Sequence, residues 1–164
     1  MIFSRACEHA IRAVLFVATQ TDGAPVGVPV IARELGLPAT TLAKVVQILT
    51  RRGILSSQKG PGGGVKLGRP ATEITVLEIV HLIDGKDLAR TCILGLPGCS
   101  EEGVHCPLHD RWSQLREQIV TMLATPSVAQ LAERLKDESH VIARVMRQSP
   151  GGFLGSLGTG GGRS

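Results

Sequence analysis

The chain contains very few aromatic residues, with one Trp, three Phe and no Tyr among 164 residues. Proteins that bind single-stranded nucleic acid stack bases on aromatic side chains, so this scarcity argues against such a platform. No uninterrupted run of about 18 apolar residues occurs, so no membrane-spanning helix is predicted. The opening residues, MIFSRACEHAIR, carry charge and lack the apolar core of a secretory signal, so a cytoplasmic protein with no membrane partner is expected.

Acidic residues are absent between Leu35 and Thr72, although the whole chain has a net charge of only +4. A local positive excess larger than that of the whole chain is typical of a surface that contacts phosphates. A solvated basic face is the alternative. The basic residues in this segment are Lys44, Arg51, Arg52, Lys59, Lys66 and Arg69.

Cysteine is also scarce, yet three of the four cysteines fall within the segment CILGLPGCSEEGVHCPLHDRW. A disulfide is disfavoured in a compartment where thiols stay reduced. Structural zinc sites favour short Cys-x2-4-Cys knuckles, and the Cys92-x6-Cys99-x6-Cys106 pattern has none. Glycines in this loop would let it turn around an iron–sulfur cluster, and His109 lies three residues beyond Cys106 at the start of a predicted helix. The pattern favours a cluster, with zinc or no metal as alternatives.

The first half of the chain has the periodicity of short helices. An amphipathic helix is predicted over 4–19, a second through Ile31 and Leu35, a stop at Gly36, and a third helix over 39–52. The third helix is expected to bury Leu42, Val45, Val46 and Leu49 and to expose Thr40, Thr41, Ala43, Lys44, Gln47, Thr50 and Arg51. Two short helices around a glycine turn favour a helix-turn-helix, with a plain helical hairpin as the alternative.

The segment GILSSQKGPGGGVKLGRP predicts a strand, a glycine-rich turn and a returning strand. A hairpin directly after a recognition helix is typical of a wing, and a lysine on a nearly bare backbone suits a narrow minor groove. The glycines do not match the G-x-x-x-x-G-K-[ST] phosphate-binding pattern. Because no nucleophile–base pair or cofactor fingerprint appears, the chain is not expected to be an enzyme.

A long helix is predicted after the cysteine loop. Its apolar residues follow a four-three-four-three spacing, which favours a coiled-coil type of dimer seam over a helix packed within one subunit. This seam consists of Leu108, Trp112, Leu115, Ile119 and Met122. The helix is expected to end at Thr125, and residues 149–164 contain seven glycines in sixteen residues, which predicts a flexible tail.

Four of these segments together resemble the Rrf-two family of winged-helix transcription regulators, in particular its IscR-like and NsrR-like members. The segments are SRACEHAIRAVLFVA, SSQKGPGGGVKL, EITVLEIVHLIDG and CPLHDRW, and the resemblance covers residues 1 to about 136. It implies a homodimer that binds a two-fold site on double-stranded DNA. IscR-like members carry arginine where this chain has Lys59, which keeps the charge without the planar fork. The DNA-binding residues that we expect are Thr40, Thr41, Lys44, Arg51, Ser57, Lys59 and Gly60.

The same resemblance implies that the three loop cysteines are ligands of an iron–sulfur cluster, either 2Fe-2S or 4Fe-4S. His109 matches the histidine used as the fourth ligand by IscR-like members, although the cysteine spacings here are one residue longer. NsrR-like members use an acidic residue of the first helix, donated by the partner, and Glu8 stands at that position. Cys7 is the third-ranked ligand, since a lone helix cysteine is more often a buried small apolar residue.

These observations predict a mainly α protein with a small β-hairpin wing, built as a winged helix-turn-helix with a long dimerisation helix. Its function is expected to be operator binding, as a repressor, gated by a cluster that senses redox state, nitric oxide or iron supply. The alternatives are a metal-free or zinc-bound regulator that responds to thiols or metabolites, and a small iron–sulfur electron-transfer protein. The expected domains are 1–85 (winged helix-turn-helix), 86–107 (cluster loop), 108–125 (dimerisation helix), 126–148 (helical segment) and 149–164 (disordered tail).

Overall fold

The computed structural model describes residues 3–20, 23–85, 92–97, 99 and 103–137 of the chain. The described part is mainly helical, with a two-stranded antiparallel hairpin, which confirms the predicted fold class. Its elements are α1 (Arg5–Thr19), α2 (Val28–Leu35), α3 (Ala39–Arg51), β1 (Leu55–Gln58), β2 (Gly64–Leu67), the 3-10 helix η1 (Ala71–Glu73), α4 (Val76–Ile83), α5 (His109–Ala124) and α6 (Val128–Asp137).

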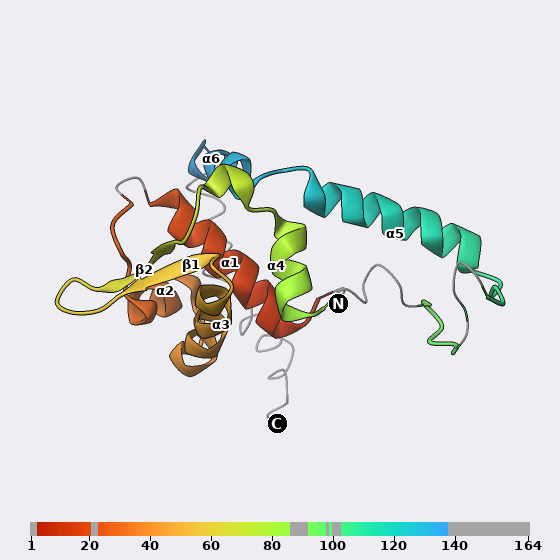
Figure 1. Ribbon diagram of the computed structural model, residues 1–164, viewed down its shortest axis with the longest axis horizontal. Coiled ribbons are helices and arrows are strands. Elements are labelled where there is room, and N and C mark those ends of the chain that lie inside the picture. The colour runs from red at the N-terminus through yellow and green to blue at the C-terminus, as the bar shows by residue number, and fades with distance from the viewer. Residues whose placement is uncertain (1–2, 21–22, 86–91, 98, 100–102, 138–164) are drawn as a thin grey trace, which may run out of the picture.

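Helix α1 lies at the centre of the part of the molecule that contains α2, α3 and the hairpin, and it packs against α3, α4 and α6 (Figure 1). It begins after Ser4, whose hydroxyl accepts a hydrogen bond from the backbone N–H of Cys7 at 3.1 Å. A serine in this position satisfies an N–H that the helix itself leaves unpaired. The buried positions recur at helical spacing, so this helix forms one wall of the main core; they are Ala10, Ala13, Val14 and Val17.

Helices α2 and α3 form the predicted helix-turn-helix. Gly36 ends α2 with a left-handed backbone (φ 63°), a conformation that favours glycine because other residues have a Cβ. The N–H of Leu37 then donates to the carbonyl of Ala32 at 2.8 Å and closes the turn. Helix α3 buries the four predicted positions against the core, namely Leu42, Val45, Val46 and Leu49.

The hairpin β1–β2 pairs Leu55 with Leu67 and Gln58 with Gly64. Its second strand has a further partner, because Val26 and Val65 exchange two backbone hydrogen bonds of 2.9 Å each. A Cβ at Gly64 would lie 2.4 Å from the carbonyl oxygen of Val26, so this close approach requires glycine. The wing is therefore fixed to the segment before α2 as well as to its own first strand.

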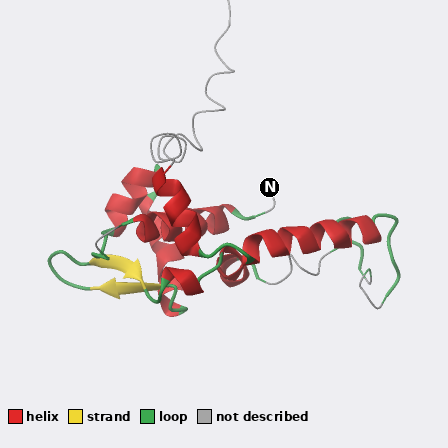
Figure 2. Ribbon diagram, turned by 90° about the horizontal axis from the view of Figure 1, so that it is seen from above, coloured by secondary structure: helices red, strands yellow, loops and turns green. Residues whose placement is uncertain are grey.

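Helix α5 extends away from α1, α2, α3 and the hairpin, and its C-terminal half packs against α4 (Figures 1 and 2). Its Leu123 is buried with Val76 and Val80 of α4 in a second apolar cluster. The chain then turns back, the N–H of Val128 donates to the carbonyl of Ile74 at 2.8 Å, and α6 covers α1. The cysteine loop is thereby held at the far end of α5.

The predicted dimerisation helix, 108–125, matches α5 closely, and the predicted helical segment 126–148 is helical from Val128 to Asp137. Residues 138–148 and the predicted tail, 149–164, lie outside the described residues. None of the helices within the described ranges has both the length and the apolar character that a membrane crossing requires.

Candidate DNA-binding surface and metal centre

The outer face of α3 carries the residues that the sequence predicted for DNA contact. Thr40, Lys44 and Arg51 are exposed, whereas Thr41 is partly buried. The N-terminus of α3 follows Pro38 and receives no hydrogen bond from a capping side chain. Its first N–H groups are therefore suited to contact a phosphate, which a helix N-terminus also attracts through its dipole.

One residue of the predicted outer face behaves differently. Thr50 is partly buried, and its hydroxyl oxygen is buried without a hydrogen-bond partner. The hydroxyl of Thr50 therefore does not lie on the exposed face of α3, although the side chain as a whole is only partly buried, as is that of Thr41.

The tip of the wing presents Ser57, Lys59 and Gly60 to solvent, as the sequence predicted. The turn closes through a hydrogen bond of 2.9 Å from the N–H of Gly63 to the carbonyl of Gly60. Gly60 and Gly62 both have positive φ, 101° and 73°, which a residue with a side chain would adopt only with strain. The tip of the wing therefore carries one cation, Lys59, followed by a glycine-rich turn with few side-chain atoms.

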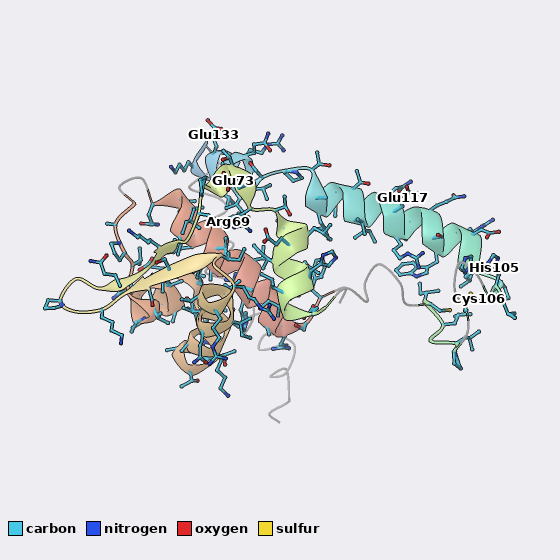
Figure 3. The ribbon with its side chains drawn as sticks, viewed as in Figure 1. Arg69, Glu73, His105, Cys106, Glu117 and Glu133 are labelled. Atoms are coloured by element: carbon cyan, nitrogen blue, oxygen red, sulfur yellow. The ribbon has the colours of Figure 1, made fainter. Side chains whose placement is uncertain are left out.

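Arg69 is the exception among the six basic residues of the acid-free segment. It forms an ion pair with Glu78 on α4 and donates a hydrogen bond of 3.1 Å to the carbonyl of Glu73, the residue beside it in Figure 3. It therefore joins the base of the wing to α4. The other five are exposed and available for phosphates: Lys44, Arg51, Arg52, Lys59 and Lys66.

The three loop cysteines converge although six residues separate each from the next. Their sulfur atoms all lie within 4.8 Å of one another, and the Cys92 and Cys106 sulfurs are 3.7 Å apart. The Nδ1 atom of His109 lies 3.4 Å from the Cys99 sulfur. Thiolate sulfurs and an imidazole are the ligands that iron–sulfur clusters and zinc use, so the donor set fits either group.

Local backbone turns bring these ligands together. Gly95 (φ 65°) donates its N–H to the carbonyl of Cys92 at 2.9 Å, which folds the loop back after the first cysteine. The N–H of Cys106 points at the Cys99 sulfur at 3.4 Å. A turn from Cys106 to His109, closed by a backbone hydrogen bond of 2.9 Å, then starts α5 with the imidazole beside the sulfurs.

The same geometry changes the acidity of the thiols. Backbone hydrogen bonds from Leu96 and Leu94 lower the pKa of Cys92 to about 7, because they stabilise the thiolate. For Cys99, the N–H of Cys106 also favours the thiolate, but burial and the two neighbouring thiols outweigh it and raise the pKa. The trio thus contains one thiol that is substantially ionised at neutral pH.

The two weaker candidates for a fourth ligand are not part of this group. Cys7 is fully buried between α1 and α4, where it packs with Val80 and Leu123, and burial raises its pKa to about 12. Glu8 lies partly buried on α1. Helix α1 and the cysteine loop occupy different parts of the molecule, so within one chain neither residue meets the three sulfurs (Figure 1).

His105, for which the sequence indicated no role, contacts the site directly. Its ring stacks on that of His109, with centroids 3.8 Å apart and an angle of 3° between the planes. Figure 3 shows His105 beside Cys106 at the outer end of α5. Because His105 lies in the loop before α5, helical spacing gave no signal of this contact, which depends on the turn from Cys106 to His109.

The predicted seam residues follow α5 and its N-cap, and the described part of the chain leaves three of the five exposed. Leu115 and Met122 are 49% and 61% exposed, Leu108 is 43% exposed, and Trp112 and Ile119 are partly buried. A helix packed only within its own subunit would bury such a seam. The interface along α5 stays a prediction, for which this exposure provides an uncovered apolar surface.

Comparison with known proteins identifies relatives along most of the chain. The family model Rrf2, described as "Iron-dependent Transcriptional regulator", matches residues 3–134. The HTH-type transcriptional regulator IscR of Photorhabdus laumondii is 33% identical over 124 residues, which cover 76% of this chain and 74% of that protein. A putative HTH-type transcriptional regulator of Aquifex aeolicus is 35% identical over 120 residues, covering 73% and 83%.

Solved structures of regulators share the fold. CymR of B. subtilis has a TM-score of 0.69 at 20% identity and covers 80% of this chain and 96% of its own. T. potens IscR has a TM-score of 0.66 at 20% identity, with coverage of 92% and 93%. The fold, the exposed recognition helix and wing, and the match over residues 3–134 lead to one assignment. This chain belongs to the Rrf2 family and is a DNA-binding winged-helix transcription regulator rather than an enzyme.

Proposed function

We propose that this regulator binds a two-fold DNA operator as a homodimer and that an iron–sulfur cluster, held by Cys92, Cys99 and Cys106, gates this binding. The observation that carries the proposal is the convergence of three sulfur atoms within 4.8 Å of one another. The imidazole of His109, 3.4 Å from the Cys99 sulfur, is the fourth ligand that we favour. Glu8, donated by a second subunit, is the next candidate.

The cluster would supply a group that gains or loses electrons and reacts with oxidants or nitric oxide. The chain's own residues provide the site around it. Cys92 offers a sulfur whose pKa is lowered to about 7 by backbone hydrogen bonds, and the N–H of Cys106 directs a hydrogen bond at the Cys99 sulfur. Such hydrogen bonds to ligand sulfur are among the factors that set the reduction potential of a cluster.

On the DNA side, we propose that Thr40, Thr41 and Lys44 enter the major groove at the N-terminus of α3. Arg51, further along the exposed face, would contact the phosphate backbone. The exposed wing tip, with Ser57, Lys59 and Gly60, would lie in the adjacent minor groove, where the bare glycine turn avoids a steric clash.

The cluster loop connects two elements that pack on the DNA-binding half, which supports a gating role. Asp84, at the end of α4, accepts hydrogen bonds from the backbone N–H of Ser4 at 2.8 Å and from its hydroxyl at 2.5 Å. At the other side of the loop, α5 packs through Leu123 against the same α4. Residues 1–85 would then act as the DNA-binding unit and residues 86–107 as the cluster loop. Residues 108–125 would form the dimer helix and residues 126–148 the C-terminal helical segment, followed by the tail 149–164.

The test begins with protein purified without oxygen. The expected result is a brown or red protein that contains iron and sulfide, and a colourless Cys99→Ala variant. Cys7→Ala serves as the matched control and should keep its iron, because Cys7 lies in the apolar core. Fluorescence anisotropy with a DNA duplex selected from a random pool should then show an affinity difference of at least tenfold between the loaded and cluster-free forms. Equal affinities would exclude gating, since a ligand shifts an equilibrium only by its differential affinity.

A second candidate is a metal-free or zinc-bound regulator that responds to thiol oxidation. It is favoured by the Cys92 and Cys106 sulfurs, which are 3.7 Å apart, and by the low pKa of Cys92. Hydrogen peroxide would accept two electrons from this pair: its O–O bond breaks, the two sulfurs form a disulfide, and the two thiol protons leave with the oxygens as two water molecules. A colourless protein with one zinc ion per chain, or a Cys92–Cys106 disulfide found by mass spectrometry after mild peroxide treatment, would favour this candidate.

A further inference from the structure

A second group of potential metal ligands lies beside the three sulfurs. One ligand atom each from His105, His109 and Asp110 lies within 4.8 Å of the other two. We propose that these three side chains bind a divalent transition-metal ion at a site that needs no thiolate and that shares His109 with the cysteine site. The existence of this site does not depend on the proposed cluster.

The backbone at the start of α5 explains why the three side chains meet. The turn from Cys106 to His109 is closed by a backbone hydrogen bond of 2.9 Å, and Asp110 follows in the first turn of the helix. The two imidazoles stack with centroids 3.8 Å apart and nearly parallel planes. This arrangement brings one ligand atom of each ring within 4.8 Å of the other and of the carboxylate.

Exposure gives an ion access to the group. His105 and Asp110 are exposed, and the neighbouring Val104 is 82% exposed, whereas His109 is only 8% exposed. Bonds of about 2.0–2.2 Å to nitrogen and oxygen place two donors on one zinc ion at most about 4.4 Å apart. To bind the ion, the exposed His105 ring turns out of the stack so that a ring nitrogen faces it, and Asp110 rotates toward it, while the buried His109 stays in place.

The donor set determines the class of ion. Two imidazoles and a carboxylate suit the borderline ions Zn²⁺, Ni²⁺ and Co²⁺, whereas the three thiolates suit softer iron–sulfur chemistry. Three protein ligands also leave coordination positions open for water. The negative charge of Asp110 offsets the positive end of the α5 dipole, which would otherwise oppose a cation at this position.

His109 belongs to both groups, and this sharing has a consequence. The Nδ1 atom of His109 lies 3.4 Å from the Cys99 sulfur, at the cysteine site. A metal ion bound by His105, His109 and Asp110 would hold this same imidazole. If the cysteine site holds the proposed cluster, the second ion competes for its fourth ligand. Divalent metal would then shorten the lifetime of the cluster, a coupling that rests on the proposed function.

The site is tested in a chain where Cys92, Cys99 and Cys106 are all replaced by Ser. Calorimetric titration with Ni²⁺ should find one ion per chain, and Co²⁺ should give d–d absorption without a sulfur charge-transfer band. Adding His105→Ala or Asp110→Asn should weaken Ni²⁺ binding at least tenfold. Adding Glu117→Gln, an exposed residue of the same helix, should leave it unchanged.

Absence of Ni²⁺ binding to the triple-serine chain, or binding that His105→Ala leaves intact, would overturn the site. If circular dichroism shows that this chain does not fold, the same comparison uses cluster-free wild-type protein whose accessible thiols are blocked with N-ethylmaleimide. Sharing is tested separately, by the rate at which a chelator removes iron from cluster-loaded protein. Ni²⁺ should raise this rate at least threefold in the wild type and not in His105→Ala, and an unchanged rate would refute the sharing. A protein that never holds a cluster would refute the proposed function and leave the first test intact.

Discussion

The four thiols of this chain differ in chemistry because their surroundings differ. Cys7 is completely buried, and desolvation, followed by the nearby Asp84 carboxylate, raises its pKa to about 12. Cys92 receives backbone hydrogen bonds that lower its pKa to about 7. At pH 8 the Cys92 thiol is therefore mostly thiolate, while the thiolate fraction of Cys7 is negligible.

We therefore expect iodoacetamide to modify Cys92 first in native, cluster-free protein and to leave Cys7 unmodified until the chain unfolds. The rate at Cys92 should rise with pH and reach half its maximum near pH 7, because ionisation of the thiol produces the reactive form. Peptide mass spectrometry after brief exposure measures both sites, and unfolded protein is the control. Modification of Cys7 as fast as that of Cys92 in the native state would contradict the burial described above.

At the scale of single elements, helices and strands were predictable where a local signal dominates. The glycine stop at Gly36 and the four buried positions of α3 follow from backbone freedom and helical period, and the structure confirms both. The pairing of Val26 with Val65 was not predictable, since a single bridged residue leaves no alternating pattern. The packing of α6 over α1 was equally hidden, because it depends on tertiary contacts rather than on period.

The contacts of the candidate site also fall into two groups, those that the sequence predicted and those that it did not. The spacing of the cysteines, the glycines between them and the family resemblance together predicted a shared site, and the structure places their sulfurs within 4.8 Å of one another. The stacking of His105 on His109 was missed because it depends on the turn between Cys106 and His109. The engagement of Arg69 by Glu78 was missed because the residues lie nine positions apart on different elements.

The wing depends on a close backbone contact, which gives the first prediction at this scale. Gly64→Ala places a methyl group 2.4 Å from the carbonyl oxygen of Val26, so β2 and the segment before α2 must separate. We expect the free energy of unfolding to fall by about 1–3 kcal/mol, the usual cost of overpacking. Urea denaturation measures this change.

Gly27→Ala is the matched control for this experiment. A Cβ at Gly27 meets its nearest atoms at 3.8 Å, an ordinary contact, and its φ of −62° suits any residue. Because alanine is a poorer N-cap than glycine, a loss of up to about 1 kcal/mol is expected there. A Gly64 variant as stable as the control would mean that the wing is not fixed to Val26.

The exposed seam of α5 gives the second prediction for an element. Leu115 is 49% exposed within one chain, so Leu115→Glu should leave the subunit folded. In the proposed dimer the new carboxylate would be buried without a partner, which is costly enough to separate the subunits. Analytical ultracentrifugation should show monomers, and Gln114→Glu, an exposed residue off the seam, should remain dimeric. A dimeric Leu115 variant would place the interface elsewhere.

At the scale of the whole molecule, the charge distribution dominates DNA binding. Each chain exposes five cations on α3, its C-terminal turn and the wing, and the proposed dimer doubles this number; they are Lys44, Arg51, Arg52, Lys59 and Lys66. With about 6–10 phosphate contacts, affinity for duplex DNA should fall by about 10³–10⁵ between 50 and 200 mM salt, because binding releases counterions. Fluorescence anisotropy over a salt series measures this slope.

Replacing Lys59 by Ala should weaken binding and reduce the salt slope by about one per subunit, because a cation leaves the wing tip. Lys136→Ala, at an exposed position of α6, is the matched control and should leave both quantities unchanged. Affinity that does not respond to salt, or a Lys59 variant that binds as the wild type does, would show that the wing does not lie against DNA.

The length of α5 gives the molecule a lever arm. The helix has 16 residues, and within the described part of the chain it packs on α4 through its C-terminal half, where Leu123 and Ile119 join the second apolar cluster. At 1.5 Å per residue it reaches about 24 Å, so a displacement of about 2 Å at the cysteine loop turns the helix by only about 5° at its root. A weak force at the tip therefore exerts a large torque on α4 and, through the Ser4–Asp84 hydrogen bonds, on the start of α1. Each helical turn removed from α5 would reduce that torque in proportion to the lost length.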